Sequence, residues 1–337
     1  MLAATRTVAV VGGGVSGLSC ARELGNHGFS VRVFDKARRP GGRTSTRRTS
    51  GGLVFDHGAQ YMTARTPDFR RAIEAWQREG VVGRWAGPFA SVGGDRRPRT
   101  QSERYVGIPT MSALSRHLAS GLDTVSQTRI VAVQRRNDAR NDARWCVVDE
   151  SGTAHGGFDS VVVAVPAGQA VPLLEAAPAL AERAASVVMA PCWAVMLVFE
   201  SPLPVAFGGV SIQGAAVAWA ARQASKPGRP DAEAWVLHAT PAWTEQHWDH
   251  ELATVAAELL KNFSVAVGFD APPPVTVDGH RWRYARAPDG ASSSAVGWDP
   301  ALGLGVCGDW CRGSRIEDAW LSGRALAQAM VDCPSQA

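Results

Sequence analysis

The first forty residues carry two short apolar runs separated by a helical pattern. Thr7 to Val11 is apolar and β-branched, as expected for a strand buried on both faces of a sheet. Beyond a glycine-rich turn, Leu18, Ala21 and Leu24 recur at helical spacing, and Ser30 to Phe34 forms a second strand-like run. The pattern predicts a strand–helix–strand unit.

The rest of the chain contains further strand-like patterns, which fall into two groups that differ in composition. Apolar runs at 129–134, 145–148, 161–165 and 304–310 indicate strands, with the duplicated tetrapeptide in NDARNDAR as a surface hairpin tip. Between 169 and 288 come alternating strands (193–199 and 235–239), proline-rich breaks and half of the twelve tryptophans. A helix is expected at 68–78. This alternating, tryptophan-containing pattern predicts a second sheet, whose aromatic residues could form either a core or a substrate cage.

The glycine-rich turn after the first strand is the strongest chemical signal. Gly12, Gly14 and Gly17 fit the GxGxxG pattern, and Asp35 follows Gly17 by 18 residues, at the end of the second strand. The three glycines allow a tight turn, close backbone approach to a pyrophosphate and close packing of helix on strand. The helix N-terminus then faces the negative charge. We therefore expect dinucleotide binding, with Asp35 on the ribose.

Two further segments indicate which dinucleotide is bound. Gly41 and Gly42 again permit close backbone approach, and Arg43 offers charge-assisted hydrogen bonds to phosphate. Near the other end, a short buried strand leads to Asp309, and a final helix begins after Arg315. The N-terminus of such a helix can face a flavin ring while Asp309 accepts a ribityl hydroxyl.

With these segments in view, the chain resembles the flavin amine oxidase superfamily. The segments that carry the resemblance are GGGVSG, PGGR and GDWCRGSRIEDAWLSG. Within the superfamily, FDHGAQYMTAR (55–65), YVGIPTMSAL (105–114) and VVAVPAGQA (162–170) are similar to the renalase branch, especially its bacterial members.

The resemblance implies an α/β fold of two domains: a discontinuous Rossmann-like FAD-binding domain and an α+β substrate domain built on a mixed or antiparallel sheet. We expect the FAD-binding domain at 1–65, 104–168 and 290–337, and the substrate domain at 66–103 and 169–289. The FAD is expected to be non-covalent, since neither Cys307 nor Cys311 is in register with the covalent cysteine of some amine oxidases. The residues expected to hold FAD are Gly12, Gly14, Val15, Ser16, Gly17, Asp35, Lys36, Gly42, Arg43, His57, Gly58, Ala59, Gln60, Ile130, Asp309, Ile316 and Ala319.

The same resemblance implies a substrate pocket near the flavin ring. The side chains expected there are Gln60, Tyr61, Tyr105 and Arg315, with Arg315 directed at a phosphate or ribose. Trp282 and His238 are weaker candidates, because a histidine on an apolar strand is more often part of the core. No catalytic side chain is assigned, since the flavin itself is the reactive group.

Composition bears on the protein's partners and cellular compartment. The 35 basic and 31 acidic side chains give a net charge of +4, which does not by itself suggest nucleic acid or an anionic membrane as partner. No apolar run approaches the roughly 18–20 residues that span a bilayer. The six cysteines contain no CxxC pair and fit buried thiols better than disulfides or a metal site. We expect a cytoplasmic protein without a metal.

The lysines bear on the choice of substrate. Amine oxidases of this superfamily typically place a lysine on a substrate-domain strand, but the matching strand here, 191–199, has none. Lys36, Lys226 and Lys261, the only lysines, lie in a loop near the adenine side, a Gly/Pro loop and an amphipathic helix. A dihydropyridine needs no such base, because its ring nitrogen lone pair drives hydride loss.

The sequence thus favours an oxidase of renalase type, which converts 1,2- and 1,6-dihydro isomers of NAD(P) to NAD(P)+ and reduces O2 to H2O2. Two alternatives stay open. One is a flavin amine oxidase or desaturase, and the other is a redox-inert flavin-binding protein.

Overall fold

The chain divides into two compact units in the computed structural model. The first unit comprises residues 1–43, 114–189 and 286–337, and the second comprises 44–113 and 190–285. The structure describes residues 5–49, 52–93, 102–137, 143–288 and 296–335.

A six-stranded sheet forms the centre of the first unit. Its strand order is β18-β19-β12-β1-β2-β8, parallel throughout except for β18. β1, β12 and β19 are buried along their lengths, which explains their uninterrupted apolar sequences. The strands are β1 (Thr7–Val11), β2 (Ser30–Phe34), β8 (Asp123–Val125), β12 (Ser160–Val163), β18 (Gly297–Asp299) and β19 (Leu304–Val306).

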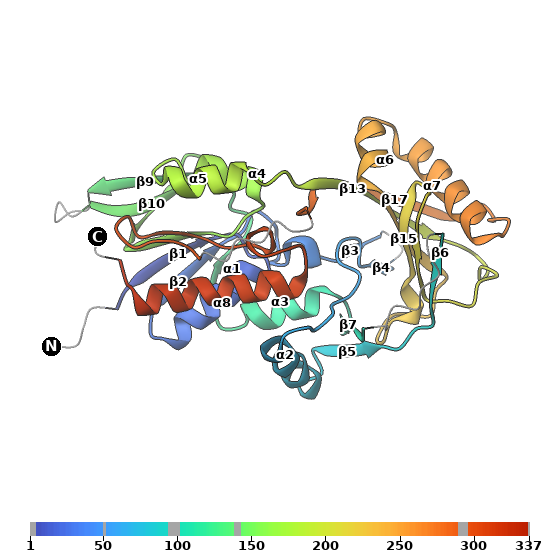
Figure 1. The fold of residues 1–337 in the computed structure, drawn as a ribbon, viewed down its shortest axis with the longest axis horizontal. Helices are drawn as coiled ribbons and strands as arrows, with labels where there is room; N and C mark the ends of the chain where they lie inside the picture. The colour runs from blue at the N-terminus through green and yellow to red at the C-terminus, as the bar shows by residue number, and fades with distance from the viewer. Residues whose placement is uncertain (1–4, 50–51, 94–101, 138–142, 289–295, 336–337) are drawn as a thin grey trace. The chain divides into compact units, whose positions relative to one another are not determined.

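Two long helices of the first unit pack directly on each other. They are α1 (Val15–Asn26), which connects β1 to β2, and the C-terminal α8 (Ile316–Asp332), drawn side by side in Figure 1. The contact requires glycine, because a Cβ at Gly323 would lie 2.1 Å from the carbonyl oxygen of Ser16. The shorter helices are α3 (Ser112–Ala119), α4 (Ala167–Ala170), η2 (Val171–Leu173), α5 (Pro178–Ala185) and η4 (Asp309–Cys311).

An antiparallel three-stranded sheet completes the first unit. It consists of β9 (Ile130–Asn137), β10 (Ala143–Asp149) and β11 (Ala154–Phe158) in the order β11-β10-β9. The strands predicted at 129–134 and 145–148 are thus confirmed as an antiparallel pair. Residues 138–142 of the predicted hairpin tip lie outside the described part of the chain.

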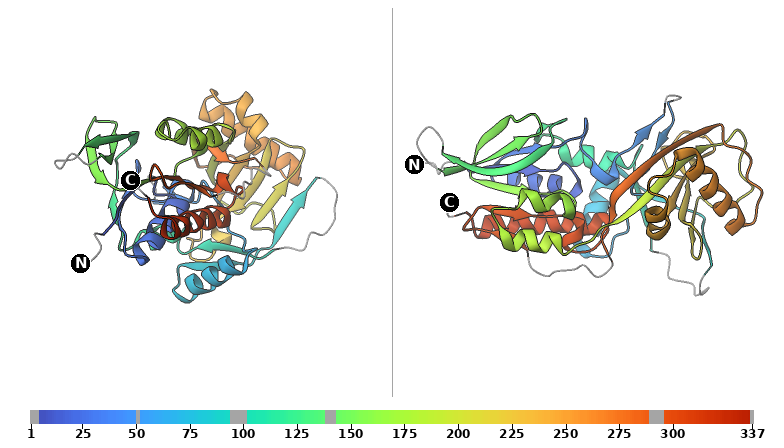
Figure 2. Two further views of the ribbon diagram at one scale, coloured as in Figure 1. Left: turned by 60° about the vertical axis from the view of Figure 1, so that its left-hand side comes forward. Right: turned by 90° about the horizontal axis from the view of Figure 1, so that it is seen from above.

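The second unit is built on a mixed sheet of six strands in the order β17-β13-β16-β15-β14-β6. β13, β16, β15 and β14 are antiparallel neighbours, whereas β14 and β6 run parallel. Helix α7 (Leu252–Val267) packs its apolar side on this sheet (Figure 2), with Leu259 and Phe263 in the core. The strands are β6 (Phe89–Val92), β13 (Ala190–Val198), β14 (Gly209–Ile212), β15 (Val217–Arg222), β16 (Ala234–Ala239) and β17 (Thr276–Arg286).

Smaller elements surround that sheet. The predicted helix is α2 (Pro67–Arg78), whose first turn is capped by Thr66 accepting from the backbone N–H of Phe69. Two antiparallel pairs are formed by β3 with β4 and by β5 with β7. Their bounds, with those of the remaining elements, are η1 (Gly42–Thr44), β3 (Arg47–Arg48), β4 (Val54–Phe55), β5 (Val82–Trp85), β7 (Arg104–Gly107), η3 (Gln223–Ser225) and α6 (Pro241–Gln246).

The fold class predicted from the sequence is confirmed, but the compact units divide the chain elsewhere. Residues 44–65 and 104–113 lie in the second unit, because Phe55 packs against β13 and β16 and β7 pairs with β5. Residues 169–189 lie in the first, where η2 contacts β9. Such contacts join residues far apart in the chain, so local sequence composition does not predict them. Within the described residues, every helix is too short or too polar to cross a bilayer.

Candidate functional site

The glycine-rich turn of the first unit is held by Asp35. One carboxylate oxygen accepts from the backbone N–H of Gly13 at 2.6 Å, and the other accepts from that of Ala37 at 2.7 Å. Burial raises the pKa of Asp35, against the effect of these two donors. A Cβ at Gly12 would lie 2.6 Å from the carbonyl oxygen of Ala164, and one at Gly17 would lie 2.1 Å from that of Gly12. Two of the three motif glycines are therefore required by close packing.

The start of α1 has the features of a phosphate cradle. Gly14 is the N-cap residue and offers no capping side chain, and a Cβ at Gly14 would have no atom within 4 Å. The Ser16 hydroxyl is buried and has no hydrogen-bond partner among the described residues. An anion at this helix N-terminus would satisfy that hydroxyl and face the positive end of the helix dipole. The residues predicted for the pyrophosphate thus fit such a group.

Two further predicted residues lie next to this turn. Gly42, with φ of +51°, is positioned so that its Cβ would lie 3.6 Å from the Cα of Gly14. Ile130 begins β9, just after a segment whose Thr128 N–H donates to the Asp35 carbonyl at 2.9 Å. Lys36 is exposed. Gly42 and Ile130 therefore lie along the same turn as Asp35.

Arg43 and Asp309 form a bidentate ion pair in the first unit. The two guanidinium nitrogens of Arg43 lie 2.8 and 2.6 Å from the two carboxylate oxygens of buried Asp309. Arg43 was expected to contact phosphate. In this structure its guanidinium binds Asp309, the residue expected to contact the ribityl chain. Arg315 is the N-cap residue of α8, and its backbone N–H donates to Asp318 at 3.0 Å. Ile316 and Ala319 follow in the first turn.

In the second unit, the segment Asp56 to Tyr61 takes part in three side-chain clusters. The first, which we call the lysine cluster, comprises Asp56, Gln60, Gln223, Lys226 and Arg229. Lys226 is completely buried, with its Nζ 2.9 Å from Oε1 of Gln60 and 3.4 Å from Oδ2 of Asp56. Arg229 donates to the same Oδ2 at 2.5 Å. One carboxylate therefore serves two buried cations.

Burial and charge oppose each other in the lysine cluster. Burial alone would raise the pKa of Asp56, but the charges of Lys226 and Arg229 outweigh it and lower that pKa. Burial lowers the pKa of Lys226 to about 8, assisted by the charge of Arg229 and opposed by Asp56. The ammonium of Lys226 is thus poised to lose its proton more readily than an exposed lysine.

The second group, the histidine cluster, comprises His57, His238, His280 and Trp282. The His57 carbonyl accepts from Nε2 of His238 at 3.0 Å and from Nε1 of Trp282 at 3.1 Å. The His57 ring stacks on Trp282 with centroids 4.9 Å apart, and its Nδ1 is buried without a partner in the described chain. Burial, aided by the charge of His280, lowers the pKa of His57 to about 3. Burial also lowers the pKa of His238, to about 4, so both rings are neutral at pH 7.

The third group, the aromatic box, comprises Tyr61, Trp85, Phe89, Arg104 and Trp219. The Tyr61 ring lies 5.3 Å from that of Trp219 and 6.2 Å from that of Trp85. The guanidinium of Arg104 lies among these rings, 3.8 Å from the centroid of Phe89. Trp85 also lies 5.3 Å from the Lys226 ammonium, so this cluster adjoins the lysine cluster.

The structure brings some of the predicted pocket residues together and separates others. His238 and Trp282 meet at His57, and Tyr61 lies in the aromatic box. The Gln60 amide is used within the protein, donating to the carbonyls of Asp56 and Gly58 and accepting from Lys226. Tyr105 directs its hydroxyl to Glu103 at 2.7 Å, and burial together with this bond raises the pKa of Tyr105 to about 12.

Sequence reasoning missed most members of these clusters, and Arg104, His280 and Lys226 are instructive cases. Arg104 precedes a residue that the resemblance singled out, and His280 lies two positions before Trp282 on β17. Lys226 was discounted because it follows η3 in a Gly/Pro loop, yet its side chain is fully buried. Its rarity was the available signal, since only three of 35 basic residues are lysine.

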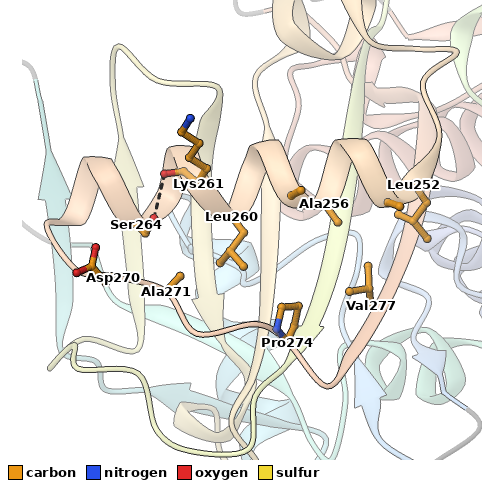
Figure 3. Close-up of a pocket in the computed structure, with 11 residues that line it drawn as sticks. Leu252, Ala256, Leu260, Lys261, Ser264, Asp270, Ala271, Pro274 and Val277 are labelled. Atoms are coloured by element: carbon orange, nitrogen blue, oxygen red, sulfur yellow. Dashed lines mark hydrogen bonds between the residues drawn. The ribbon is translucent and has the colours of Figure 1, made fainter.

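Two other features of the second unit share no residue with the three clusters. A groove of about 800 Å³ runs along α7. It is lined chiefly by apolar side chains such as Leu252, Leu260 and Val277 (Figure 3). On the same unit, His247, His250 and Glu258 each present a ligand atom within 4.8 Å of the others. The sequence predicted no metal, and neither feature contains a residue predicted for the site.

Comparison with known proteins matches two family models to successive stretches of the chain. Residues 10–77 match a model described as an NAD(P)-binding Rossmann-like domain. Residues 90–331, well over half of the chain, match a model described as flavin containing amine oxidoreductase.

Individual relatives match only short stretches of sequence. Protoporphyrinogen oxidase 2 of Arabidopsis thaliana is 33% identical over 32% of this chain and 19% of its own length. A phytoene desaturase of Rhodobacter capsulatus is 45% identical over 20% of this chain and 12% of its own length. The chain thus spans less than a fifth of the curated relatives it matches. Putrescine oxidase bound to putrescine has a similar fold, with a TM-score of 0.70 over 97% of this chain and 99% of the other, at 16% identity.

Proposed function

This chain belongs to the flavin-containing amine oxidoreductase family, and we propose that it is an FAD-dependent oxidase of dihydro-NAD(P) isomers, as in renalase. Family membership implies a flavin cofactor. The substrate, the electron acceptor and non-covalent binding of FAD are our proposals.

The first unit offers the residues that would hold FAD. The open space at Gly14 and the unpartnered Ser16 hydroxyl suit the pyrophosphate, and Asp35 suits the adenosine ribose. Asp309 keeps lone pairs beyond those used by Arg43 and suits a ribityl hydroxyl. The bound flavin would supply a hydride acceptor that returns two electrons to oxygen. Since neither Cys307 nor Cys311 is in register with the covalent cysteine of some amine oxidases, we expect acid precipitation to release all of the flavin.

The observation that carries the substrate proposal is the charge of the three clusters. Their described residues hold one carboxylate, Asp56, against the basic side chains of Lys226, Arg229 and Arg104. His57 and His238 add no charge at pH 7, because burial lowers their pKa values. The positive potential of these groups favours an anionic dinucleotide and disfavours a cationic amine.

The chain's own groups need only bind and orient a dihydropyridine. Each turnover removes one hydride and leaves an aromatic pyridinium, and O2 leaves as H2O2 with one proton from that hydride and one from solvent. No side chain has to remove a proton from the substrate. The ring of Trp282 offers a stacking face, and the unpartnered Nδ1 of His57 suits a carboxamide. A neutral His57 also avoids repelling the pyridinium product.

A second candidate is oxidation of an amine, which the buried Lys226 favours. An ammonium whose pKa is lowered to about 8 exchanges protons near neutrality and can assist a reaction that requires a neutral amine. Against this candidate, Arg104 already occupies the aromatic box that an alkylammonium would prefer.

An oxygen-consumption assay separates these candidates. The FAD-loaded protein is given borohydride-reduced NAD, which contains the isomers, and in parallel normal NADH and a panel of mono- and diamines. We expect oxygen uptake and peroxide with the isomers alone. Uptake with an amine alone would establish the second candidate, and no uptake with any donor would indicate a redox-inert flavoprotein.

A further inference from the structure

Arg104 lies in an unusual setting within the second unit. Its guanidinium carbon is 3.8 Å from the ring centroid of Phe89, 4.9 Å from that of Tyr61 and 5.4 Å from that of Trp219. On the paired strands β5 and β7, Arg104 lies opposite Trp85. Rings around a guanidinium fix its orientation and shield its faces from water, while its N–H groups, which lie in the guanidinium plane, still require acceptors.

Two N–H donors of this box have no acceptor. Nη1 of Arg104 and Nε1 of Trp219 are both buried and unpartnered among the residues that the structure describes. A buried donor without an acceptor costs about 1–3 kcal/mol, and more when it is charged. The described chain therefore leaves two donors of one cluster available to an acceptor from a ligand or from water.

The nearest acid along the chain is turned away from Arg104. Glu103 lies 3.2 Å from Nη2 of Arg84 and accepts from the Tyr105 hydroxyl at 2.7 Å. Because side chains alternate along a strand, Glu103 and Tyr105 share the face opposite to Arg104. On the Arg104 side, the Lys226 ammonium over Trp85 adds further positive charge. The described residues therefore leave this box with a strong preference for an anion.

We propose that Arg104 and Trp219 form an oxyanion subsite that binds a phosphate group of the substrate. The guanidinium edge matches two phosphate oxygens, and the indole N–H supplies a third, neutral donor. The assignment to a phosphate rests on the proposed function, since a dihydro-NAD(P) substrate carries its negative charge there. The existence of an anion subsite does not depend on that function.

Ligand binding to the FAD-loaded protein tests the subsite without turnover. Calorimetry gives dissociation constants for NAD+, NADP+, ADP-ribose and nicotinamide riboside, the last of which lacks phosphate. Arg104→Gln should weaken the three phosphate-bearing ligands by about ten- to a hundredfold and leave nicotinamide riboside unchanged. Arg104→Lys should fall between the two proteins, and Trp219→Phe should weaken binding by about two- to tenfold. A loss for Arg104→Gln that is larger with NADP+ than with NAD+ would place the 2′-phosphate at the subsite, and equal losses would place the pyrophosphate there.

Arg84→Gln is the matched control, because Arg84 lies on the neighbouring strand with a largely exposed side chain paired to Glu103. It should leave all four dissociation constants unchanged. Unaltered binding of phosphate ligands to Arg104→Gln and Trp219→Phe, with melting temperatures near that of the unsubstituted protein, would overturn the subsite. Arg104-dependent binding of benzoate, without any of ADP-ribose, would overturn its assignment to phosphate.

The two proposals fail in different ways. If the isomers are not oxidised but ADP-ribose still binds in an Arg104-dependent manner, the oxidase function is wrong and the subsite stands. If the isomers are oxidised with the same KM by Arg104→Gln, the function stands and the subsite is wrong.

Discussion

Each unit contains a buried carboxylate that binds arginine at the candidate site, Asp309 in the first and Asp56 in the second, and the two sites differ in their balance of charge. In the first unit, Asp309 and Arg43 form a one-to-one pair, and the Arg43 side chain keeps 28% of its surface exposed. In the second unit, Asp56 faces both Lys226 and Arg229, whose side chains are 0% and 1% exposed. The first site is neutral and reached by water, whereas the second retains an excess positive charge in a dry environment.

The difference shows how burial can be used for two purposes. A balanced pair such as Arg43 with Asp309 holds two chain segments together at a modest desolvation penalty. An unbalanced group is costly to bury, and it generates a positive potential over its surroundings. The adjoining aromatic box adds Arg104 to that potential. We therefore regard the second unit as adapted to an anionic substrate.

The largest expected effect comes from removing the single acid of the lysine cluster. Asp56→Asn should lower the free energy of unfolding by about 3–5 kcal/mol, because it leaves two buried cations without a counter-charge. Asp309→Asn should lower it less, since water reaches Arg43. Urea unfolding followed by tryptophan fluorescence at saturating FAD measures both. Equal losses of unfolding free energy in the two variants would contradict the proposed difference in charge balance between the sites.

Acid should act next most strongly, through the histidine cluster. The pKa values of His57 and His238 in the folded protein, about 3 and 4, lie below the unfolded value near 6.5. Below pH 6.5 the unfolded chain therefore binds protons that the folded chain excludes, so stability falls with pH. Between pH 6.5 and 5.5 the two residues should together remove about 2 kcal/mol of stability.

His238→Gln provides the control for that experiment. The glutamine amide can replace the Nε2 donor to the His57 carbonyl, but it does not titrate. The acid-induced loss between pH 6.5 and 5.5 should fall by roughly half. An unchanged pH dependence would show that other groups cause it.

A smaller effect is expected at Asp35, which acts through hydrogen bonds to the backbone. Asp35→Ala removes the acceptor of the Gly13 and Ala37 N–H groups and the expected contact with the ribose. FAD binding should weaken by about ten- to a hundredfold, corresponding to roughly 1.5–3 kcal/mol. The flavin content of the protein after dilution and gel filtration measures this loss. Retention of FAD equal to that of the unsubstituted protein would refute the assignment.

The smallest effect is expected from Lys226→Met, which restores a one-to-one ratio in the second unit. Asp56 would keep its 2.5 Å bond to Arg229, and the cost of burying an ammonium would disappear. The free energy of unfolding should change by less than about 1 kcal/mol, in either direction. Arg229→Met is the comparison and should be clearly destabilising, because Arg229 also donates to the carbonyls of Gly107 and Pro227. Equal losses in the two variants would contradict the account of excess charge.

The contrast between the units also explains what the sequence could predict. The cradle around Gly12, Gly14 and Asp35 is encoded within thirty residues, so spacing alone identifies it. The fold class was implied by the family resemblance, which these local motifs helped to identify. The ion pair of Arg43 with Asp309 joins segments 266 residues apart, and no local pattern reports it.

The clusters of the second unit were harder to predict for the same physical reason. Asp56, Arg104 and Lys226 come from separate segments that only the folded chain brings together. A loop composition around Lys226 suggested exposure, whereas burial depends on the tertiary packing of Trp85 and Gln60. Tyr105 was predicted for the pocket, but its neighbour Arg104 is the residue in the aromatic box. Successive side chains of a strand point to opposite faces, so an error of one residue selects the wrong face.

The most direct test of the central claim is anaerobic reduction of the bound flavin in single-turnover mixing. Normal NADH offers hydride from C4, whereas the 1,2- and 1,6-dihydro isomers offer it from the carbons beside the ring nitrogen. A site that holds those carbons in place leaves C4 displaced by an ångström or more, which costs about a hundredfold in rate. We predict rapid bleaching of the flavin absorbance by the isomers and bleaching at least about a hundredfold slower by NADH. Fast reduction by normal NADH, with the isomers inert, would contradict the proposed function.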